Sequence, residues 1–154
     1  MRVAFGADDE NETTAAVRNR LVEAGHELVP VRADAWPDIG AGVGRAVVDG
    51  SAELGVVLCW TGTGVSIAAN KVPGVRAALA WEPWVAAGAR RWNDANVLAL
   101  SLKRLAPAVA VEVLDAFLAV EEPAADERPA LDRLAGLEVP GGTAGPTAPV
   151  PADH

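Results

Sequence analysis

The feature that most constrains the fold is the run at residues 55–59, which reads GVVLC and contains no charged or amide side chain. A half-buried strand alternates apolar and polar side chains, whereas this run is apolar at every position. Such a strand is buried on both faces, which is typical of a parallel sheet covered by helices on both sides. The run therefore predicts layers of helix, sheet and helix.

The rest of the chain alternates strand and helix in agreement with this interpretation. Strands are predicted at residues 3–5, 28–31, 55–59, 75–80 and 96–100. Helices are predicted at residues 15–24, 39–48, 83–91, 108–120 and 129–134, with one more that ends near residue 70. Pro30 favours an edge position for its strand, and Thr13 or Thr14 is expected to cap the first helix. The alternation predicts a three-layer α/β fold with a parallel sheet and right-handed crossovers.

Length and composition narrow the classes of protein. A chain of 154 residues has the size of one domain, and 51% hydrophobic residues suffice for a core. The net charge of −8 argues against a nucleic-acid or membrane partner, and no apolar run approaches the ~20 residues of a membrane span. The single cysteine, Cys59, excludes an internal disulfide and a multi-cysteine zinc site. A cytoplasmic protein is the simplest interpretation.

Composition also divides the chain into two parts. Residues 1–138 carry the apolar patterns and are expected to form one α/β domain. From residue 139 onward, Pro, Gly, Ala and Thr dominate and large apolar residues are almost missing. Residues 139–154 are therefore expected to be a disordered tail.

In a parallel α/β sheet, ligands bind beyond the carboxyl ends of the strands. The candidate loops are residues 6–14, 59–66 and 81–84 and the turn before Asn96. The second of these runs from the apolar strand through two glycines into a helix, so backbone N–H groups and the helix dipole favour negative charge there. A thiolate at Cys59 would then suit a general base that removes a proton next to a carbonyl. The alternative is that Cys59 is a small buried side chain at a strand end.

Several segments resemble the family of ribose-5-phosphate isomerase B and galactose-6-phosphate isomerase. They are residues 2–8, 36–38, 59–79 and 93–100, and the resemblance spans about residues 1–135. SIAANK at residues 66–71 is a specific signature in this setting. The resemblance implies a Rossmann- or flavodoxin-like αβα domain with a five-stranded, mainly parallel sheet. It also implies aldose–ketose isomerisation through a cis-enediolate without a cofactor, and a homodimer with the active site between subunits.

The same resemblance implies particular site residues. Cys59 occupies the position of the base that moves a proton between adjacent sugar carbons. Asp8 would bind sugar hydroxyls, and Asn93 would contact the developing oxyanion from the neighbouring subunit. The anion-stabilising loop would consist of Thr61, Gly62, Thr63, Gly64 and Ser66.

The chain departs from the family pattern where phosphate binding and ring opening are concerned. Asp9 replaces a histidine after the first strand, and Trp92 replaces the histidine that opens the sugar ring. Lys103 replaces an arginine. Of the C-terminal arginines expected in the family, at most one remains, at Arg128. These departures predict weak activity on ribose 5-phosphate and a substrate that is non-phosphorylated or already open-chain. The alternative is that Lys103, Arg104 and Arg128 rebuild the phosphate site.

Other assignments stay open at this stage. Trp60 and Trp92 replace family active-site residues and are expected to line the pocket, where an indole can stack on a sugar. Arg90 is either a substrate contact or part of a solvated helix face. The acidic residues 8–12 are interpreted as a solvated loop rather than a divalent-cation site, and no metal is expected. The alternative function is a divergent sugar- or nucleoside-binding member of the family that has lost isomerase activity.

Overall fold

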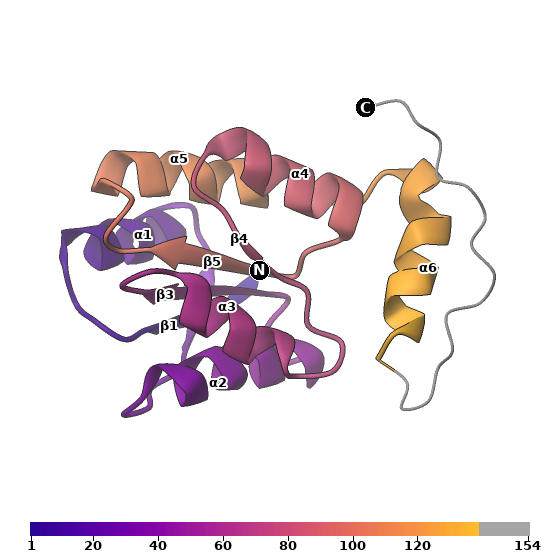
Figure 1. Ribbon diagram of the computed structural model, residues 1–154. Coiled ribbons are helices and arrows are strands. Elements are labelled where there is room, and N and C mark those ends of the chain that lie inside the picture. The colour runs from indigo at the N-terminus through magenta and orange to yellow at the C-terminus, as the bar shows by residue number, and fades with distance from the viewer. Residues whose placement is uncertain (139–154) are drawn as a thin grey trace.

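The computed structural model describes residues 1–138. In these residues a sheet of five parallel strands lies between two layers of helices (Figure 1). The strands are β1 (Arg2–Ala7), β2 (Glu27–Pro30), β3 (Leu54–Cys59), β4 (Ala77–Leu79) and β5 (Val97–Ser101), in the spatial order β2-β1-β3-β5-β4. The helices are α1 (Glu12–Glu23), α2 (Trp36–Val48), α3 (Thr63–Asn70), α4 (Pro83–Asn93), α5 (Pro107–Leu118) and α6 (Arg128–Gly136), the last preceded by the short 3₁₀ helix η1 (Ala125–Glu127).

The layers are those that the alternation predicted. Helices α1, α4 and α5 cover one face of the sheet, α2 and α3 cover the other, and α6 stands apart from both (Figure 1). The predicted three-layer, Rossmann-like αβα fold is therefore confirmed. Within the described residues no helix is both long and apolar enough to cross a membrane. The predicted tail, residues 139–154, lies outside the residues that the structure describes.

Two apolar cores, one on each face of the sheet, hold the layers together. Leu58 and Phe117 belong to the core beneath α1, α4 and α5, and Val57 and Val65 to the core beneath α2 and α3. Strand β3 supplies side chains to both cores, and all of its residues are buried. Full burial of one such side chain contributes about 1.5–3 kcal/mol to folding. The interpretation of residues 55–59 as a strand buried on both faces is thus confirmed.

All the predicted strands and helices are present, and their ends differ for local reasons. The strand expected at residues 75–80 is shorter, because the Arg76 N–H donates to Oδ1 of Asn96 at 2.8 Å and not to a neighbouring strand. Helix α2 begins at Trp36, three residues earlier than predicted, and carries a proline in its first turn where no N–H group is needed. Strand β2 lies at the edge of the sheet, as Pro30 predicted.

The structure corrects the predicted cap of α1. The N-cap is Asn11, whose Oδ1 accepts a 3.0 Å hydrogen bond from the Thr14 N–H. Thr13 and Thr14 are buried inside the first turn, where their hydroxyls donate to the carbonyl oxygens of Leu105 and Asp9. The Thr13 contact connects α1 to the loop after β5. The Thr13 hydroxyl, which could otherwise cap the helix, therefore forms a tertiary hydrogen bond.

Replacing Asn11 with Ala is expected to lower the free energy of unfolding by about 0.5–2 kcal/mol, because the first turn loses its side-chain acceptor. Urea denaturation followed by circular dichroism measures the change. Asn11→Ser is the matched control, since serine also caps helices well, and it should stay close to wild type. Equal stability of the Ala and Ser variants would contradict the assigned cap.

Candidate active site

Neighbouring strands bring Asp8 and Cys59 to the same edge of the sheet. Cys59 is the last residue of β3, is 5% exposed, and pairs with Ser101 at the end of β5. On the other side of β3, the Asp8 N–H donates to the Leu58 carbonyl oxygen at 3.1 Å. The carboxyl ends of β1, β3 and β5 therefore surround Cys59, as expected for a ligand site in this kind of sheet.

The turn after Cys59 requires a glycine at position 62. Gly62 has φ +77° and forms the N-cap of α3, and its N–H lies 3.1 Å from Sγ and 3.2 Å from the carbonyl oxygen of Cys59. A Cβ atom on Gly62 would lie 2.5 Å from Cδ1 of Leu79 and 3.0 Å from the carbonyl carbon of Leu100. The sharp turn thus directs a backbone donor at the sulfur, an arrangement that supports negative charge on it.

Hydroxyl groups of the same loop extend the polar surface beside the sulfur. Oγ1 of Thr61 lies 3.9 Å from Sγ of Cys59 and 2.7 Å from Oγ1 of Thr63, and both threonines are exposed. Ser66 differs from them, because its hydroxyl donates to the Ala77 carbonyl oxygen at 3.4 Å. The structure therefore brings the two threonines together near the sulfur and engages the serine with strand β4.

Tryptophan side chains lie on two sides of the loop. Trp60 is 52% exposed, and the Lys103 ammonium nitrogen lies 5.4 Å from the centroid of its ring. The Lys103 N–H also donates to the Trp60 carbonyl oxygen at 3.0 Å, so the two residues are joined through main chain and side chain. Trp36 lies over Gly64, where a Cβ atom would be 3.0 Å from the indole ring. A cation near an indole face is an attractive arrangement that holds Lys103 beside Cys59.

The acidic loop after β1 places Asp8 and Asp9 next to each other on the surface. Partial burial, and after it the negative charge of Asp9, raises the pKa of Asp8 above its ordinary value, while a backbone hydrogen bond acts against this. Glu10 is paired with Arg18. Among residues 1–138, no group of three or more His, Cys, Asp or Glu side chains is placed to hold a metal ion.

Two predicted site residues, Asn93 and Arg128, lie at the opposite end of the sheet from Cys59. Asn93 ends α4, and three residues later the Asn96 carbonyl oxygen accepts from the N–H of Gly55, near the start of β3. Arg128 begins α6, which stands at the far end from the tip of β5 (Figure 1). The turn before Asn96 was expected among the carboxyl-end loops, and that expectation is wrong. A crossover helix returns the chain to the start of the next parallel strand, so this turn lies at the amino end.

Trp92 also lies on α4, one residue before its end. Its ring covers Gly88, where a Cβ atom would come within 2.5 Å of the indole, and it meets the ring of Trp84 edge to face at 5.4 Å. Trp92 is 36% exposed and Trp84 is 68% exposed. Within one chain this pair therefore forms an outward apolar surface on α4.

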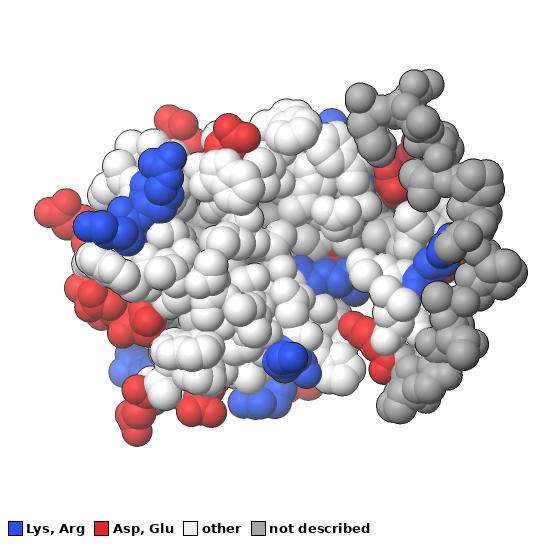
Figure 2. All heavy atoms as spheres, in the orientation of Figure 1, with Lys and Arg blue, Asp and Glu red and all other residues white. Residues whose placement is uncertain are grey.

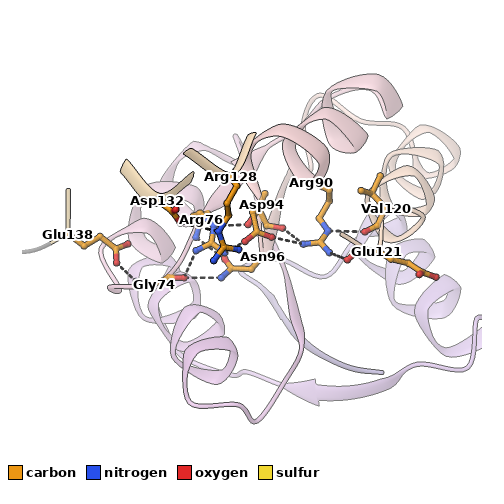
Figure 3. Close-up of polar contacts among 11 residues, drawn as sticks. Gly74, Arg76, Arg90, Asp94, Asn96, Val120, Glu121, Arg128, Asp132 and Glu138 are labelled. Carbon is orange, nitrogen blue, oxygen red and sulfur yellow. Dashed lines mark hydrogen bonds and ion pairs between the residues drawn. The ribbon is translucent and has the colours of Figure 1, made fainter. Parts of the chain in front are cut away.

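Arg90 fits neither of the two interpretations considered from the sequence. It is buried, and its guanidinium donates to the carbonyl oxygens of Ala95, Val120 and Glu121 at 2.8, 3.2 and 3.1 Å (Figure 3). Burial lowers the pKa of Arg90 from its ordinary value, and the charge of Asp94 acts in the opposite direction. Arg90 thus ties α4 to the segment after α5. Helical periodicity in the sequence does not predict these contacts of Arg90, because the segment after α5 that covers it is irregular.

Known proteins are similar to this chain in sequence and fold over two thirds or more of their length. Residues 3–134 match the family described as ribose/galactose isomerase. Ribose-5-phosphate isomerase B of Escherichia coli (strain K12) is 32% identical over 148 residues, 89% of this chain and 96% of that protein. The D-erythrulose-4-phosphate isomerase of Pectobacterium atrosepticum is 35% identical over 103 residues, 67% of this chain and 68% of that protein. The solved structure of Clostridium thermocellum ribose-5-phosphate isomerase B has a TM-score of 0.82 and 31% identity, covering 90% of this chain and 97% of that chain.

The fold, the cysteine loop and these relatives together define an aldose–ketose isomerase, an enzyme of carbohydrate metabolism. The chain belongs to the ribose/galactose isomerase family. The resemblance noted in the sequence is thereby confirmed.

Replacing Asp9 with Asn is expected to lower the pKa of Asp8 toward its ordinary value, because the neighbouring negative charge disappears while partial burial remains. NMR titration of the Asp8 carboxyl carbon measures the shift. Since the folded state binds this proton more tightly than the unfolded state, the stability that Asp8 contributes is lost as pH rises through the raised pKa. Asp9→Asn should reduce that loss.

Glu12→Gln is the control for this titration, because it removes one negative charge from the start of α1 and Glu12 does not contribute to the shift of Asp8. Its Asp8 should titrate as in wild type. The same Asp8 pKa in wild type and in Asp9→Asn would contradict the assigned electrostatic coupling.

Proposed function

We propose that this enzyme interconverts an open-chain aldose and ketose by moving a proton between adjacent carbons, with Cys59 as the general base. The observation that carries the proposal is the Gly62 N–H directed at Sγ of Cys59, beside the paired Thr61 and Thr63 hydroxyls. A base beside donors for an oxyanion is what enolisation requires.

The proposed reaction moves one proton between adjacent carbons and one between their oxygens. The Cys59 thiolate removes a proton from the carbon next to the carbonyl, and the electron pair of that C–H bond moves to the carbonyl oxygen. The resulting cis-enediolate carries its charge on oxygen, where the loop from Thr61 to Gly64 and the N-terminus of α3 stabilise it. The proton of the neighbouring hydroxyl passes to this oxygen, and the thiol returns the first proton to the carbon that had carried the carbonyl. The carbonyl therefore appears one carbon away, and no cofactor is consumed.

The proposed substrate is a short sugar phosphate, or a sugar, that is already open-chain. Trp92 stands where the family has the histidine that opens the ring, and an open-chain substrate needs no such group. The relative from P. atrosepticum bears the name D-erythrulose-4-phosphate isomerase. In that tetrulose phosphate the oxygen on carbon 4 is esterified, so it cannot close a ring on the carbonyl. Asp8, Asp9 and Trp60 would contact the substrate, and Lys103, held beside Trp60, would supply a cation from the same chain.

We further propose that two copies of the chain build each site. Asn93 and Arg128 lie at the opposite end of the sheet from Cys59, so one chain cannot bring them together. A two-fold symmetric pair can place the amino end of one sheet against the carboxyl end of the other. The face over α3, β4 and α4 is largely uncharged (Figure 2). Ile67 of α3 and Trp84 of α4 are 59% and 68% exposed. Such a surface suits an isologous interface.

Replacing Cys59 with Ala is expected to lower turnover by about a hundredfold or more, because the proton transfer loses its base. The measurement is aldose–ketose conversion together with uptake of solvent deuterium at the carbon next to the carbonyl. An unchanged melting temperature serves as the control for folding. Undiminished turnover in folded Cys59→Ala would exclude Cys59 as the base.

The enzyme is expected to convert D-erythrulose 4-phosphate much faster than ribose 5-phosphate, because Asp9, Trp92 and Lys103 replace groups that serve ring opening and phosphate binding. Loss of one charge-assisted hydrogen bond costs about 1.5–3 kcal/mol, or about 10- to 100-fold in affinity. Steady-state kinetics on both compounds decide this point. Ordinary turnover of ribose 5-phosphate with a sub-millimolar KM would show that the substitutions leave the family's usual substrate in place.

A mixture of Cys59→Ala and Asn93→Ala subunits is expected to regain about one quarter of wild-type activity after subunit exchange. About half of the dimers are then mixed, and each mixed dimer has one intact site because its Cys59 and Asn93 come from different chains. Light scattering on the same samples should report twice the chain mass. Mixed dimers that stay as inactive as either parent would disprove the shared site.

A further inference from the structure

Asp94, which follows Asn93, adopts a left-handed backbone conformation, which residues with a Cβ atom adopt less often than glycine. It has φ +49° and ψ +41°, and it is the one non-glycine residue with positive φ among residues 1–138. A left-handed residue ends many helices, where glycine is the usual residue, and aspartate or asparagine is tolerated because its short side chain can form hydrogen bonds nearby. The hydrogen bonds of the Asp94 side chain therefore bear on why an aspartate stands at this point.

The Asp94 side chain and carbonyl group are both held by Arg76, the residue before β4. Nε of Arg76 donates to the Asp94 carbonyl oxygen at 2.7 Å, and Nη2 donates to Oδ2 of Asp94 at 2.8 Å (Figure 3). The arginine is itself fixed, because its N–H donates to Oδ1 of Asn96 and its Nη1 to the carbonyl oxygen of Gly74. Both side chains are only about one-third exposed, at 30% and 35%. Two bonds from one planar group fix the position and the orientation of Asp94.

The same pair lies beside the start of α6. Nη1 of Arg90 is 3.8 Å from Oδ1 of Asp94, and Arg90 also anchors the segment that leads to α6 through the carbonyl oxygens of Val120 and Glu121. A hollow of about 230 Å³ is lined by Arg76, Asp94 and Arg128 (Figure 3). One network therefore connects the end of α4, which carries Asn93, with the segment that leads to α6.

We propose that Arg76 is a positioning residue, which acts through Asp94 to fix the end of α4 so that Asn93 meets the neighbouring subunit's site in one geometry. The inference rests on the function proposed above for Asn93. The Arg76–Asp94 pair touches no substrate in this account. It holds Asn93 at the end of α4 in place before the two chains meet. This position matters because a displacement of about 1 Å of a catalytic group can cost a hundredfold in rate.

Arg76→Met is expected to lower kcat about 10- to 100-fold with little change in KM, since Asn93 contacts charge that develops only in the transition state. Arg76→Lys should recover part of the loss, because an ammonium can reach one of the two Asp94 oxygens but not both. Arg20→Met is the matched control. It breaks a surface pair with Asp115 of similar length, 2.7 Å, and should leave kcat unchanged.

Asp94 variants separate the backbone conformation from the side-chain contacts. Asp94→Gly tolerates positive φ but loses the carboxylate, whereas Asp94→Asn tolerates it and keeps an acceptor for Arg76. The expected order of kcat is wild type, then Asp94→Asn, then Asp94→Gly. Wild-type kcat in both Asp94→Gly and Arg76→Met would overturn the proposal.

Two further measurements distinguish positioning from general loss of structure. In ¹⁵N relaxation of the free protein, the Asn93 amide order parameter is expected to fall from about 0.85 to below about 0.6 in Arg76→Met, with the strands unchanged. After subunit exchange, Arg76→Met should complement Cys59→Ala as Asn93→Ala does, because the arginine and the cysteine of one chain serve different sites. The activity assays use D-erythrulose 4-phosphate.

The outcomes separate the two proposals. If Asn93→Ala complements Cys59→Ala but Arg76→Met does not, the shared site stands and the positioning by Arg76 is wrong. If neither variant complements Cys59→Ala, the shared site is wrong and the inference built on it is wrong too. If Asn93 becomes mobile in Arg76→Met while kcat stays at the wild-type value, Arg76 does order Asn93, and the proposed contact of Asn93 with the oxyanion is wrong.

Discussion

The burial of β3 on both faces decides where this protein can carry out chemistry. Its side chains fill the cores above and below the sheet, so polar groups collect only beyond its carboxyl end. There the chain must turn at once into α3, and the turn requires Gly62 in a left-handed conformation against Leu79 and Leu100. The same turn directs an N–H group at Cys59. One packing constraint thus places both a sulfur and its donor at the ligand edge.

Most of the fold was predictable because hydrophobic periodicity reports burial directly. The apolar run at 55–59, the proline of the edge strand and the helical patterns each reflect a local property, and the structure confirms them. The cap of α1 was not predictable, because Asn11, Thr13 and Thr14 all have capping side chains. The choice among them depends on the Leu105 carbonyl, a contact with a distant segment. Arg90 was misjudged for the same reason, since its partners lie on an irregular segment.

The candidate site was predictable only in part. Glycines that follow an apolar strand indicate an anion-binding turn, and this local pattern located Cys59 and its loop. The residues at the other end of the sheet were identified through family resemblance alone, because neither Asn93 nor Arg128 has a local pattern of its own. The left-handed conformation of Asp94 had no sequence signal, since aspartate is common in turns of every kind. Topology nevertheless fixes the location of Asn93 and Asp94, since the crossover helix α4 ends beside the start of β5.

Helix α6 has nine residues, none of them buried, and its last turn is followed by Glu138, which accepts a hydrogen bond from the Gly74 N–H at 2.8 Å. A helix of this length in water gains too little from its own hydrogen bonds to offset the entropy of ordering its backbone. If two copies build each site as proposed above, a surface of the partner that covers α6 would supply the missing stabilisation. Part of the helical structure of this chain would then be stabilised by association and not by folding of the monomer.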